Sequence, residues 1–168
     1  MEFKKVITER YSVRSFDKRT IEKEKLDAIL EAARLAPTAC NNQPQRIKVL
    51  TTAKDLALVD SVSPCRYNAP VAILVCYDKT KAWVSKVDGV MHGEVDASIV
   101  LTQMMLQAAD LGLGSLWVGM FDPKKTCEVF KLGANIVPVS FLMVGYPAPD
   151  SRPAKMHTDR KPLKELLI

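Results

Sequence analysis

The chain has 168 residues, of which 48% are hydrophobic and 26% are charged, as in ordinary globular proteins. This length fits a single domain, 1–168, with a sizeable core. The net charge of +5 is dispersed and only 7% of the residues are aromatic, which argues against a nucleic-acid partner. No apolar run approaches the roughly 18 residues of a membrane span, and the start MEFKKVITER lacks a signal-peptide core, so we expect a cytoplasmic protein with no membrane partner.

The first third of the chain predicts two helices, a polar loop and a strand. Residues 2–9 can form a short helix, and residues 21–35 carry an apolar stripe at helical spacing. Thr20 is the expected N-cap of the second helix, and Pro37 ends it. TACNNQPQ, residues 38–45, is polar and predicts a loop, and the alternating, β-branched RIKVLTT that follows predicts a strand.

The middle of the chain predicts a buried strand and a long helix. Residues 53–61 favour a short helix, and the continuous apolar run VAILVCY at 71–77 is typical of a strand buried on both faces. Residues 80–91 show no regular pattern. From Val95 to Leu111, apolar residues cover most of the helix circumference. Such a helix either lies at the centre of one core or is covered on its second face by a partner.

The last third of the chain predicts two strands, a helix and a tail. SLWVGMF at 115–121 favours a strand, and residues 122–131 a helix that begins with the cap Asp122-Pro123. Residues 135–147 favour a further strand, in which Pro138 indicates an edge position or a late start. The tail 149–168 is rich in proline and charge, so we expect it to extend over another surface, such as that of a second subunit.

The sequence offers no protein nucleophile or metal site. Its two histidines and four cysteines show no spacing typical of zinc ligands or of a Cys–His nucleophile. LGLGS at 111–115 does not match a dinucleotide fingerprint, and no phosphate-cradling glycine-lysine loop is present. An enzyme with this sequence would take its chemistry from a bound cofactor.

Basic residues near both ends of the chain suit an anion. Arg10, Ser12 and Arg14 alternate in RYSVRSF, and Arg160 and Lys161 stand near the C-terminus. Guanidinium forks and a hydroxyl match the charge and the acceptors of a phosphate monoester. The alternative is that each is an ordinary solvated surface residue.

Four segments, in this order, together resemble the FMN-dependent nitroreductase family, in particular its short members. They are RYSVRSF at 10–16, APTACNNQP at 36–44, LGLGSLWVGMFD at 111–122, and VGYP at 144–147 with the closing RKPL at 160–163. The resemblance implies an α+β fold, with three α/β/α layers around a mixed, mainly antiparallel sheet. It also implies an intertwined homodimer with FMN sites at the subunit interface.

The resemblance further implies a ping-pong NAD(P)H oxidoreductase, in which bound FMN passes hydride to a nitroaromatic, a quinone or a similar electron-poor acceptor. The Gly119 N–H would lie near the flavin N5, and the loop that includes Thr38 and Asn41 would come from the other subunit. A flavin carrier without its own NAD(P)H turnover, or one reduced by a protein partner, remains the alternative. The implied cofactor-binding residues are Arg10, Tyr11, Ser12, Arg14, Pro37, Thr38, Ala39, Cys40, Asn41, Gln43, Trp117, Val118, Gly119, Arg160 and Lys161.

Three positions depart from the family pattern. Cys40 stands where a small residue or serine is common, so a thiol would lie near the flavin. Gln45 replaces a common tryptophan, which changes the outer wall of the site. His157 stands where a basic residue often accompanies Arg160, so either His157 or Lys161 would complete the phosphate site.

Overall fold

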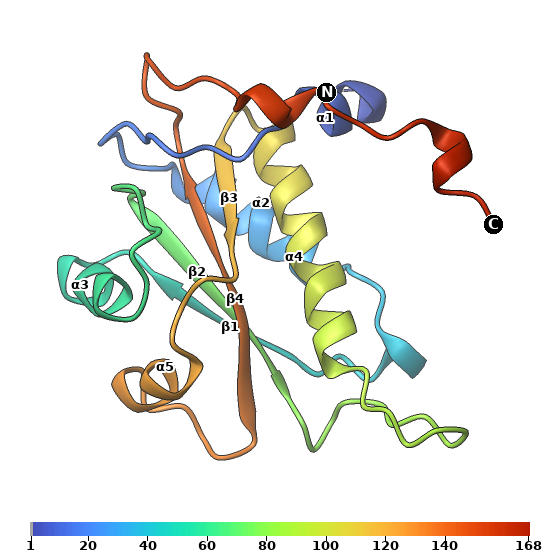
Figure 1. Ribbon diagram of the computed structural model, residues 1–168. Helices are drawn as coiled ribbons and strands as arrows, with labels where there is room; N and C mark the ends of the chain where they lie inside the picture. Colours follow the sequence, from blue (N-terminus) through green and yellow to red (C-terminus); the bar gives the residue numbers. More distant parts are fainter. Residues whose placement is uncertain (1) are drawn as a thin grey trace.

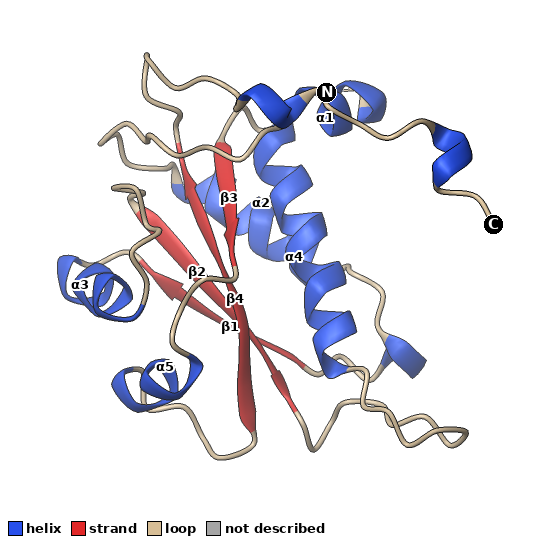
Figure 2. Cartoon of the chain, viewed as in Figure 1, coloured by secondary structure: helices blue, strands red, loops and turns tan. Residues whose placement is uncertain are grey.

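A computed structural model describes residues 2–168, which form one three-layer domain (Figures 1 and 2). The helices are α1 (Phe3–Glu9), α2 (Lys23–Arg34), α3 (Ala53–Val62), α4 (Gly93–Asp110) and α5 (Pro123–Val129). The strands are β1 (Gln45–Leu50), β2 (Val71–Asp78), β3 (Gly114–Val118) and β4 (Ile136–Gly145). Short 3₁₀ turns lie at Ala39–Asn41, Lys155–His157 and Leu163–Glu165.

The four strands form one sheet in the order β1-β2-β4-β3, with every neighbouring pair antiparallel. Ile73 of β2 pairs with Val49 on one side and Leu142 on the other. A parallel bridge between Ser12 and Ser115 adds the N-terminal segment beside β3, so the sheet is mixed but mainly antiparallel. Helices α2 and α4 cover one face and α3 and α5 the other (Figure 1), which confirms the predicted α+β fold class.

Strand alternation distributes the apolar residues between two cores. In β2, Ile73 and Val75 face α2 and α4, whereas Leu74 and Cys76 face α3 and α5. Phe141 and Leu142 of β4 divide in the same way, and both are fully buried. The continuous apolar run at 71–77 is therefore a strand buried on both faces, as predicted.

One local prediction is wrong, and one of the two alternatives left open for Pro138 is excluded. Thr20 does not cap α2, because the helix begins after Glu22, and no side chain caps its first turn. Strand β4 does not start late at Pro138, because it already begins at Ile136. Pro138 is tolerated because it pairs with Cys76 at a bulge in β2, and because β3 reaches only as far as Phe141. On its β3 side, Pro138 therefore lies at a local edge, where no partner needs an N–H.

Helix α4 has one buried face and one open face within the chain. Its buried face includes Val100, Leu101 and Met104, all fully buried against the sheet and α2. On the opposite face Val95 is 52% exposed, and Ile99 is half-buried. The single chain therefore covers only part of the apolar circumference predicted for this helix.

The predicted cap of α5 leads to a stability test. The Asp122 side chain accepts a hydrogen bond from the Lys125 N–H at 3.0 Å, and Pro123 occupies the first turn. We expect Asp122→Ala to lower the free energy of unfolding by about 1 kcal/mol in urea denaturation, because one helix N–H loses its acceptor. Asp122→Asn keeps an acceptor oxygen and is expected to stay within about 0.5 kcal/mol of wild type. Equal stability of the alanine variant and wild type would refute this role.

Candidate anion-binding site

The segment RYSVRSF is fixed between β3 and the chain that follows β4. The Val13 N–H donates to the Ser115 carbonyl at 3.0 Å, and the Ala148 N–H donates to the Ser15 carbonyl at 3.0 Å. Glycine is required at position 114, because a Cβ there would lie 2.6 Å from the Val13 side chain. The close approach of Val13 to β3 thus places Ser12 beside Ser115 at the sheet edge.

The C-terminal tail folds back over the same segment. The Tyr11 hydroxyl donates to Ser151 Oγ at 3.2 Å, and the Tyr11 and His157 rings meet edge-on with their centres 6.2 Å apart. Both ends of the chain thereby enclose a cavity of about 180 Å³. It is lined by Arg10, Tyr11, Ser12, Arg14, Ala154, Met156, His157 and Arg160.

This cavity, the basic pocket, collects positive charge without a matching carboxylate. Within residues 2–168, Arg10, Arg14 and Arg160 form no ion pair. Arg14 donates only to the Ser12 carbonyl, at 3.5 Å, and Arg160 donates to the Asp159 carbonyl at 2.6 Å. Three guanidinium groups in one pocket, with donors still free, suit an anion with several acceptor oxygens, such as a phosphate.

The lining of the pocket distinguishes between His157 and Lys161, the two candidates for the basic residue that accompanies Arg160. His157 is half-buried and lines the pocket, whereas Lys161 is exposed and does not line it. Sequence reasoning did not identify Ala154 and Met156 as lining residues. Small and apolar residues in a proline-rich tail carry no signal of their own, because their place depends on how the tail folds back.

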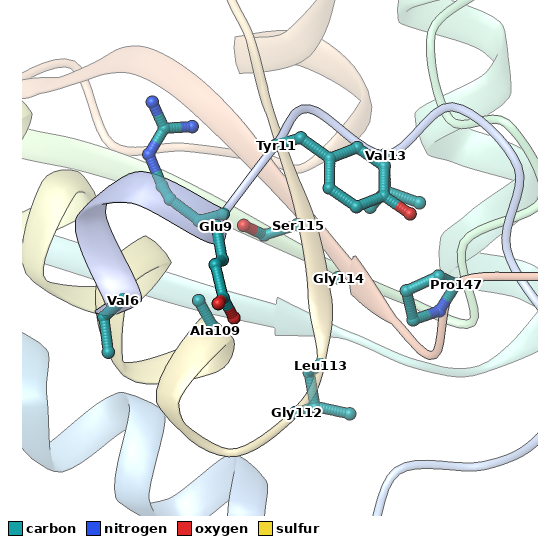
Figure 3. A pocket seen from close by; sticks show the side chains of 11 residues that line it. Val6, Glu9, Tyr11, Val13, Ala109, Gly112, Leu113, Gly114, Ser115 and Pro147 are labelled. Carbon is teal, nitrogen blue, oxygen red and sulfur yellow. The ribbon is translucent and has the colours of Figure 1, made fainter. Parts of the chain in front are cut away.

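A second cavity, of about 190 Å³, adjoins the basic pocket and shares Arg10 and Tyr11 with it (Figure 3). Its other walls come from α1, the C-terminal end of α4, the start of β3 and Pro147. Val6 and Leu113, both labelled in Figure 3, are among its apolar lining residues. The basic pocket therefore lies at the end of α4 where that helix turns into β3.

The predicted residues Trp117 and Val118 lie farther along the edge strand β3, and Gly119 directly follows its last residue. Trp117 is half-buried against the α2–α4 core, and the Val118 carbonyl accepts the buried Ser140 hydroxyl at 2.7 Å. Gly119 is exposed, and no heavy atom lies within 4 Å of the place where a Cβ would stand. Gly119 lies four residues after Ser115 along an extended chain, which corresponds to about 13 Å. The edge strand thus leads from the basic pocket to an exposed glycine.

The loop 38–43 occupies the other end of α4. It contains the 3₁₀ turn Ala39–Asn41, and the exposed Pro37 precedes it. The Thr38 Oγ1 accepts from the Gln43 N–H at 3.0 Å. The Ala39 N–H donates to Asp96, in the first turn of α4, at 2.8 Å. Cys40, Asn41 and Gln43 all have left-handed backbone conformations, with φ of 51°, 53° and 49°.

A single chain therefore does not bring all the predicted site residues together. The basic pocket lies at the C-terminal end of α4 and the loop 38–43 at its N-terminal end (Figure 1). A helix of 18 residues separates them by about 27 Å. The residues of the basic pocket and Gly119 lie along one sheet edge, whereas the loop 38–43 lies at the other end of α4.

Two further findings bear on the class of site. None of the helices within residues 2–168 is long and apolar enough to cross a membrane. The side chains that the structure describes include no cluster of three or more His, Cys, Asp or Glu residues able to hold a metal ion. The basic pocket is therefore the site for which the described residues give the clearest ligand chemistry.

The fold and the pocket together define a three-layer α/β/α protein whose two chain ends meet at a basic site on the sheet edge. The family model described as "Nitroreductase family" matches residues 7–66 and 63–146, so the chain belongs to the nitroreductase family. The resemblance found in the four sequence segments is thereby confirmed.

Individual relatives agree with this assignment. A nitroreductase family protein of Clostridium difficile 630, known from a crystal structure, is 40% identical, with a TM-score of 0.94 over 100% of this chain and 98% of its own. A Methanothermobacter thermautotrophicus protein provisionally named NADH dehydrogenase/NAD(P)H nitroreductase is 30% identical over 95% of this chain and 88% of its own. A Bacillus subtilis protein named FMN reductase [NAD(P)H] is also 30% identical, over 86% of this chain and 65% of its own.

Proposed function

We propose that the protein is an FMN-dependent NAD(P)H oxidoreductase that reduces nitroaromatics, quinones or similar electron-poor acceptors. The observation that carries this proposal is the unpaired basic pocket at one end of an open sheet edge that leads to the Gly119 N–H. FMN has a phosphate at one end and a ring system at the other, so its chemistry fits such an arrangement. The names of the Bacillus subtilis and Methanothermobacter relatives support both FMN and NAD(P)H.

Each end of this edge has a distinct task in the proposal. Arg10, Arg14 and Arg160 hold the phosphate with charge-assisted hydrogen bonds, and His157 replaces Lys161 as their neighbour. The Ser12 hydroxyl is a further donor. Near the ring system, the Gly119 N–H supplies a fixed backbone dipole, which stabilises developing negative charge without a titrating side chain. Bound FMN supplies the redox chemistry, because it accepts hydride from NAD(P)H and passes electrons to the acceptor.

We also propose that the functional unit is a homodimer. Two copies of α4 packed antiparallel about a two-fold axis would bring the loop 38–43 of each chain to the basic-pocket end of its partner. The open face of α4 is suited to this contact, because a groove of about 690 Å³ runs along it. Helix α4 and the segment before it line this groove with apolar and uncharged polar side chains and one carboxylate: Val90, Met91, Glu94, Val95, Ser98, Ile99, Thr102 and Gln103. Thr38, Cys40 and Asn41 would then complete the partner's flavin site.

The C-terminal tail supports the same assembly. Within 149–168, Leu163, Leu166 and Leu167 are 71%, 66% and 67% exposed, and this part of the tail runs away from the body of the chain (Figure 1). Apolar side chains so exposed next to one another favour burial against another molecule. We assign that surface to the second subunit, with the tail as part of the intertwined dimer.

The absorption spectrum of the purified protein tests the proposed function. We expect a yellow protein with flavin absorbance near the usual visible bands, which NADH or NADPH bleaches in the absence of air and which an added quinone or nitroaromatic restores. A colourless protein that takes up no FMN would contradict the proposal. Bound flavin that neither nicotinamide nucleotide reduces would favour the carrier alternative over an enzyme with its own NAD(P)H turnover.

A further inference from the structure

A buried carboxylate connects the loop 38–43 to α4. Asp96 is 1% exposed, and its Oδ1 accepts the Ala39 N–H at 2.8 Å. Its Oδ2 is buried and has no hydrogen-bond partner. Within residues 2–168, Asp96 forms no ion pair. The bond to Ala39 is thus the contact through which this carboxylate acts on the surrounding chain.

Helix stability alone does not account for Asp96. An acidic residue in the first turn of a helix is favourable, but the exposed Glu94 already provides that charge. His92, not Asp96, is the N-cap of α4, and the Asp96 N–H only closes the first helical hydrogen bond to the His92 carbonyl. A buried carboxylate oxygen without a partner is destabilising, so the burial of Asp96 requires an explanation other than helix stability.

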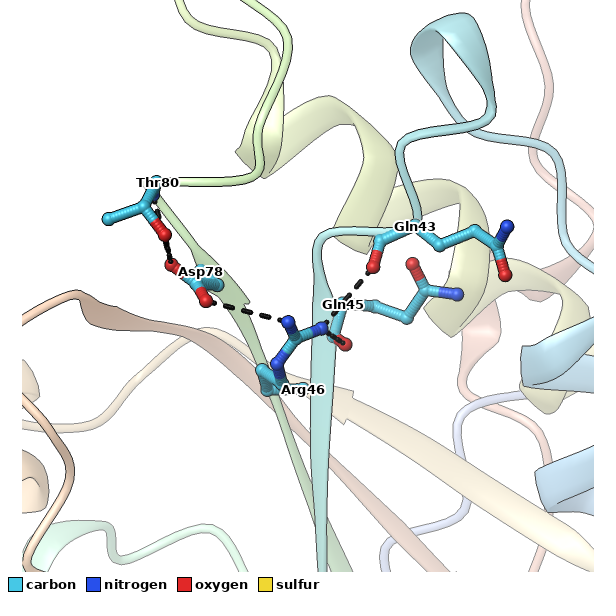
Figure 4. Close-up of polar contacts among 5 residues, drawn as sticks. All are labelled: Gln43, Gln45, Arg46, Asp78 and Thr80. Atoms are coloured by element: carbon cyan, nitrogen blue, oxygen red, sulfur yellow. Dashed lines mark hydrogen bonds and ion pairs between the residues drawn. The ribbon is translucent and has the colours of Figure 1, made fainter.

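The loop itself needs external support. Cys40, Asn41 and Gln43 have left-handed backbones, which side chains other than glycine adopt at a cost. At its far end the loop is held by Arg46, which donates to the Gln43 carbonyl at 3.3 Å and pairs with Asp78 at 3.4 Å (Figure 4). Arg46 is exposed, so water competes with its bonds. The bond to Asp96 at the near end is part-buried and its acceptor carboxylate is 1% exposed, so water competes with it less and it is the stronger restraint.

We propose that Asp96 is a positioning residue that holds the loop 38–43 in the conformation that enters the flavin site of the partner subunit. This inference rests on the proposed function and dimer, and it adds the residue that fixes the loop. Asp96 points from α4 towards the loop, while its neighbour Val95 lies on the open face of the same helix. Helix α4 thus forms the proposed dimer interface and also fixes the loop 38–43, which reaches the partner subunit across that interface.

FMN titrations of two variants test the role of the carboxylate. Asp96→Ala removes the acceptor, and we expect about 10-fold weaker FMN binding. Asp96→Asn keeps an oxygen for the Ala39 N–H, so its affinity is expected to stay within about 3-fold of wild type. Val59→Ala is the matched control, because it opens a buried position in α3, on the opposite face of the sheet, and is expected to leave FMN affinity unchanged. Wild-type affinity in Asp96→Ala would overturn the proposal.

Amide hydrogen exchange of the protein without FMN gives a second readout, independent of any flavin. We expect the Ala39 amide to exchange at least about 10-fold faster in Asp96→Ala than in wild type or Asp96→Asn, because it loses its buried acceptor. Unchanged exchange would overturn the positioning role even if FMN binds. If wild type binds no FMN, the proposed function fails, while the exchange rates still decide whether Asp96 holds the loop.

A third variant covers the case in which Asp96→Ala does not fold. Ala39→Pro removes the donor N–H and leaves Asp96 in place, and the extended backbone of Thr38 is compatible with a following proline. We expect it to accelerate exchange at Asn41 and Asn42, whose N–H groups bond back to Thr38 and Ala39. Wild-type protection at both amides would count against the bond as the support of the loop.

Discussion

Arg14→Ala is expected to weaken FMN binding by about 10- to 100-fold, because a charge-assisted hydrogen bond contributes about 1.5–3 kcal/mol. The free energy of unfolding should stay within about 0.5 kcal/mol of wild type. Arg14 is exposed, forms no ion pair in residues 2–168 and donates only a long bond to the Ser12 carbonyl. Its removal therefore costs the fold little but removes one of three guanidinium groups from the basic pocket. FMN fluorescence titration and urea denaturation measure the two effects separately.

Two controls make this result specific. Lys48→Ala removes the same charge from an exposed position of β1, outside the basic pocket, and should change FMN affinity by less than about 2-fold. Lys161→Ala tests whether His157, and not Lys161, is the basic residue that accompanies Arg160, because His157 lines the pocket and Lys161 does not. Equal FMN affinity in Arg14→Ala and wild type would remove Arg14 from the site. A loss in Lys161→Ala as large as that in Arg14→Ala would show that the tail is placed differently when FMN binds.

The layer arrangement could be predicted because local patterns decide it. The run VAILVCY has no polar face, so only a position between two helical layers satisfies it. Asp122-Pro123 combines a cap acceptor with a residue that lacks the N–H which the first turn leaves unpaired. The buried strand and the start of α5 both depend on residues that are neighbours in sequence, and the structure agrees with both predictions.

The start of α2 could not be predicted, because residues distant in sequence decide it. The Tyr146 hydroxyl donates to Glu22 at 2.6 Å and accepts from Lys25 at 2.7 Å, while the Arg19 guanidinium lies 3.2 Å from the centre of its ring. The hydrogen bond from Tyr146 lowers the pKa of Glu22, and the bond to Tyr146 raises the pKa of Lys25. Glu22, which belongs to this cluster, has an extended backbone and is the N-cap of α2, so the helix begins at Lys23 and Thr20 lies too far before it to be the cap.

The candidate site was predictable in its parts but not in its arrangement. Arginine and hydroxyl groups in RYSVRSF indicate an anion from their chemistry alone, and the structure brings them to Arg160. The distance between this pocket and the loop 38–43 depends on the length and direction of α4, which no motif encodes. The left-handed backbones of Cys40 and Gln43 also carry no sequence signal, because both residue types normally avoid that region.

Charges on the open face of α4 are expected to separate the subunits. The double variant Val95→Asp/Ile99→Asp should weaken dimerisation by about 100-fold or more, because two carboxylates would have to be buried without partners in an apolar contact. Val95 is 52% exposed, whereas the half-buried Ile99 also packs against the α2–α4 core, so urea denaturation must accompany the experiment to show that the variant chain is folded. Sedimentation velocity across a range of protein concentrations measures the effect.

The same variant should lose FMN although its own basic pocket is intact. In the proposed dimer each flavin needs the loop 38–43 of the other chain, so separated subunits keep the phosphate contacts and lose the loop that covers the ring. Leu35→Asp is the matched control, because it places a carboxylate on an apolar residue that is 62% exposed at the C-cap of α2 and does not line the groove on α4. It should remain dimeric and bind FMN. A wild-type protein that sediments as a monomer with FMN bound would show that the single chain builds its site without the partner's loop. A dimer that survives both charges would show that the subunits do not meet through the open face of α4.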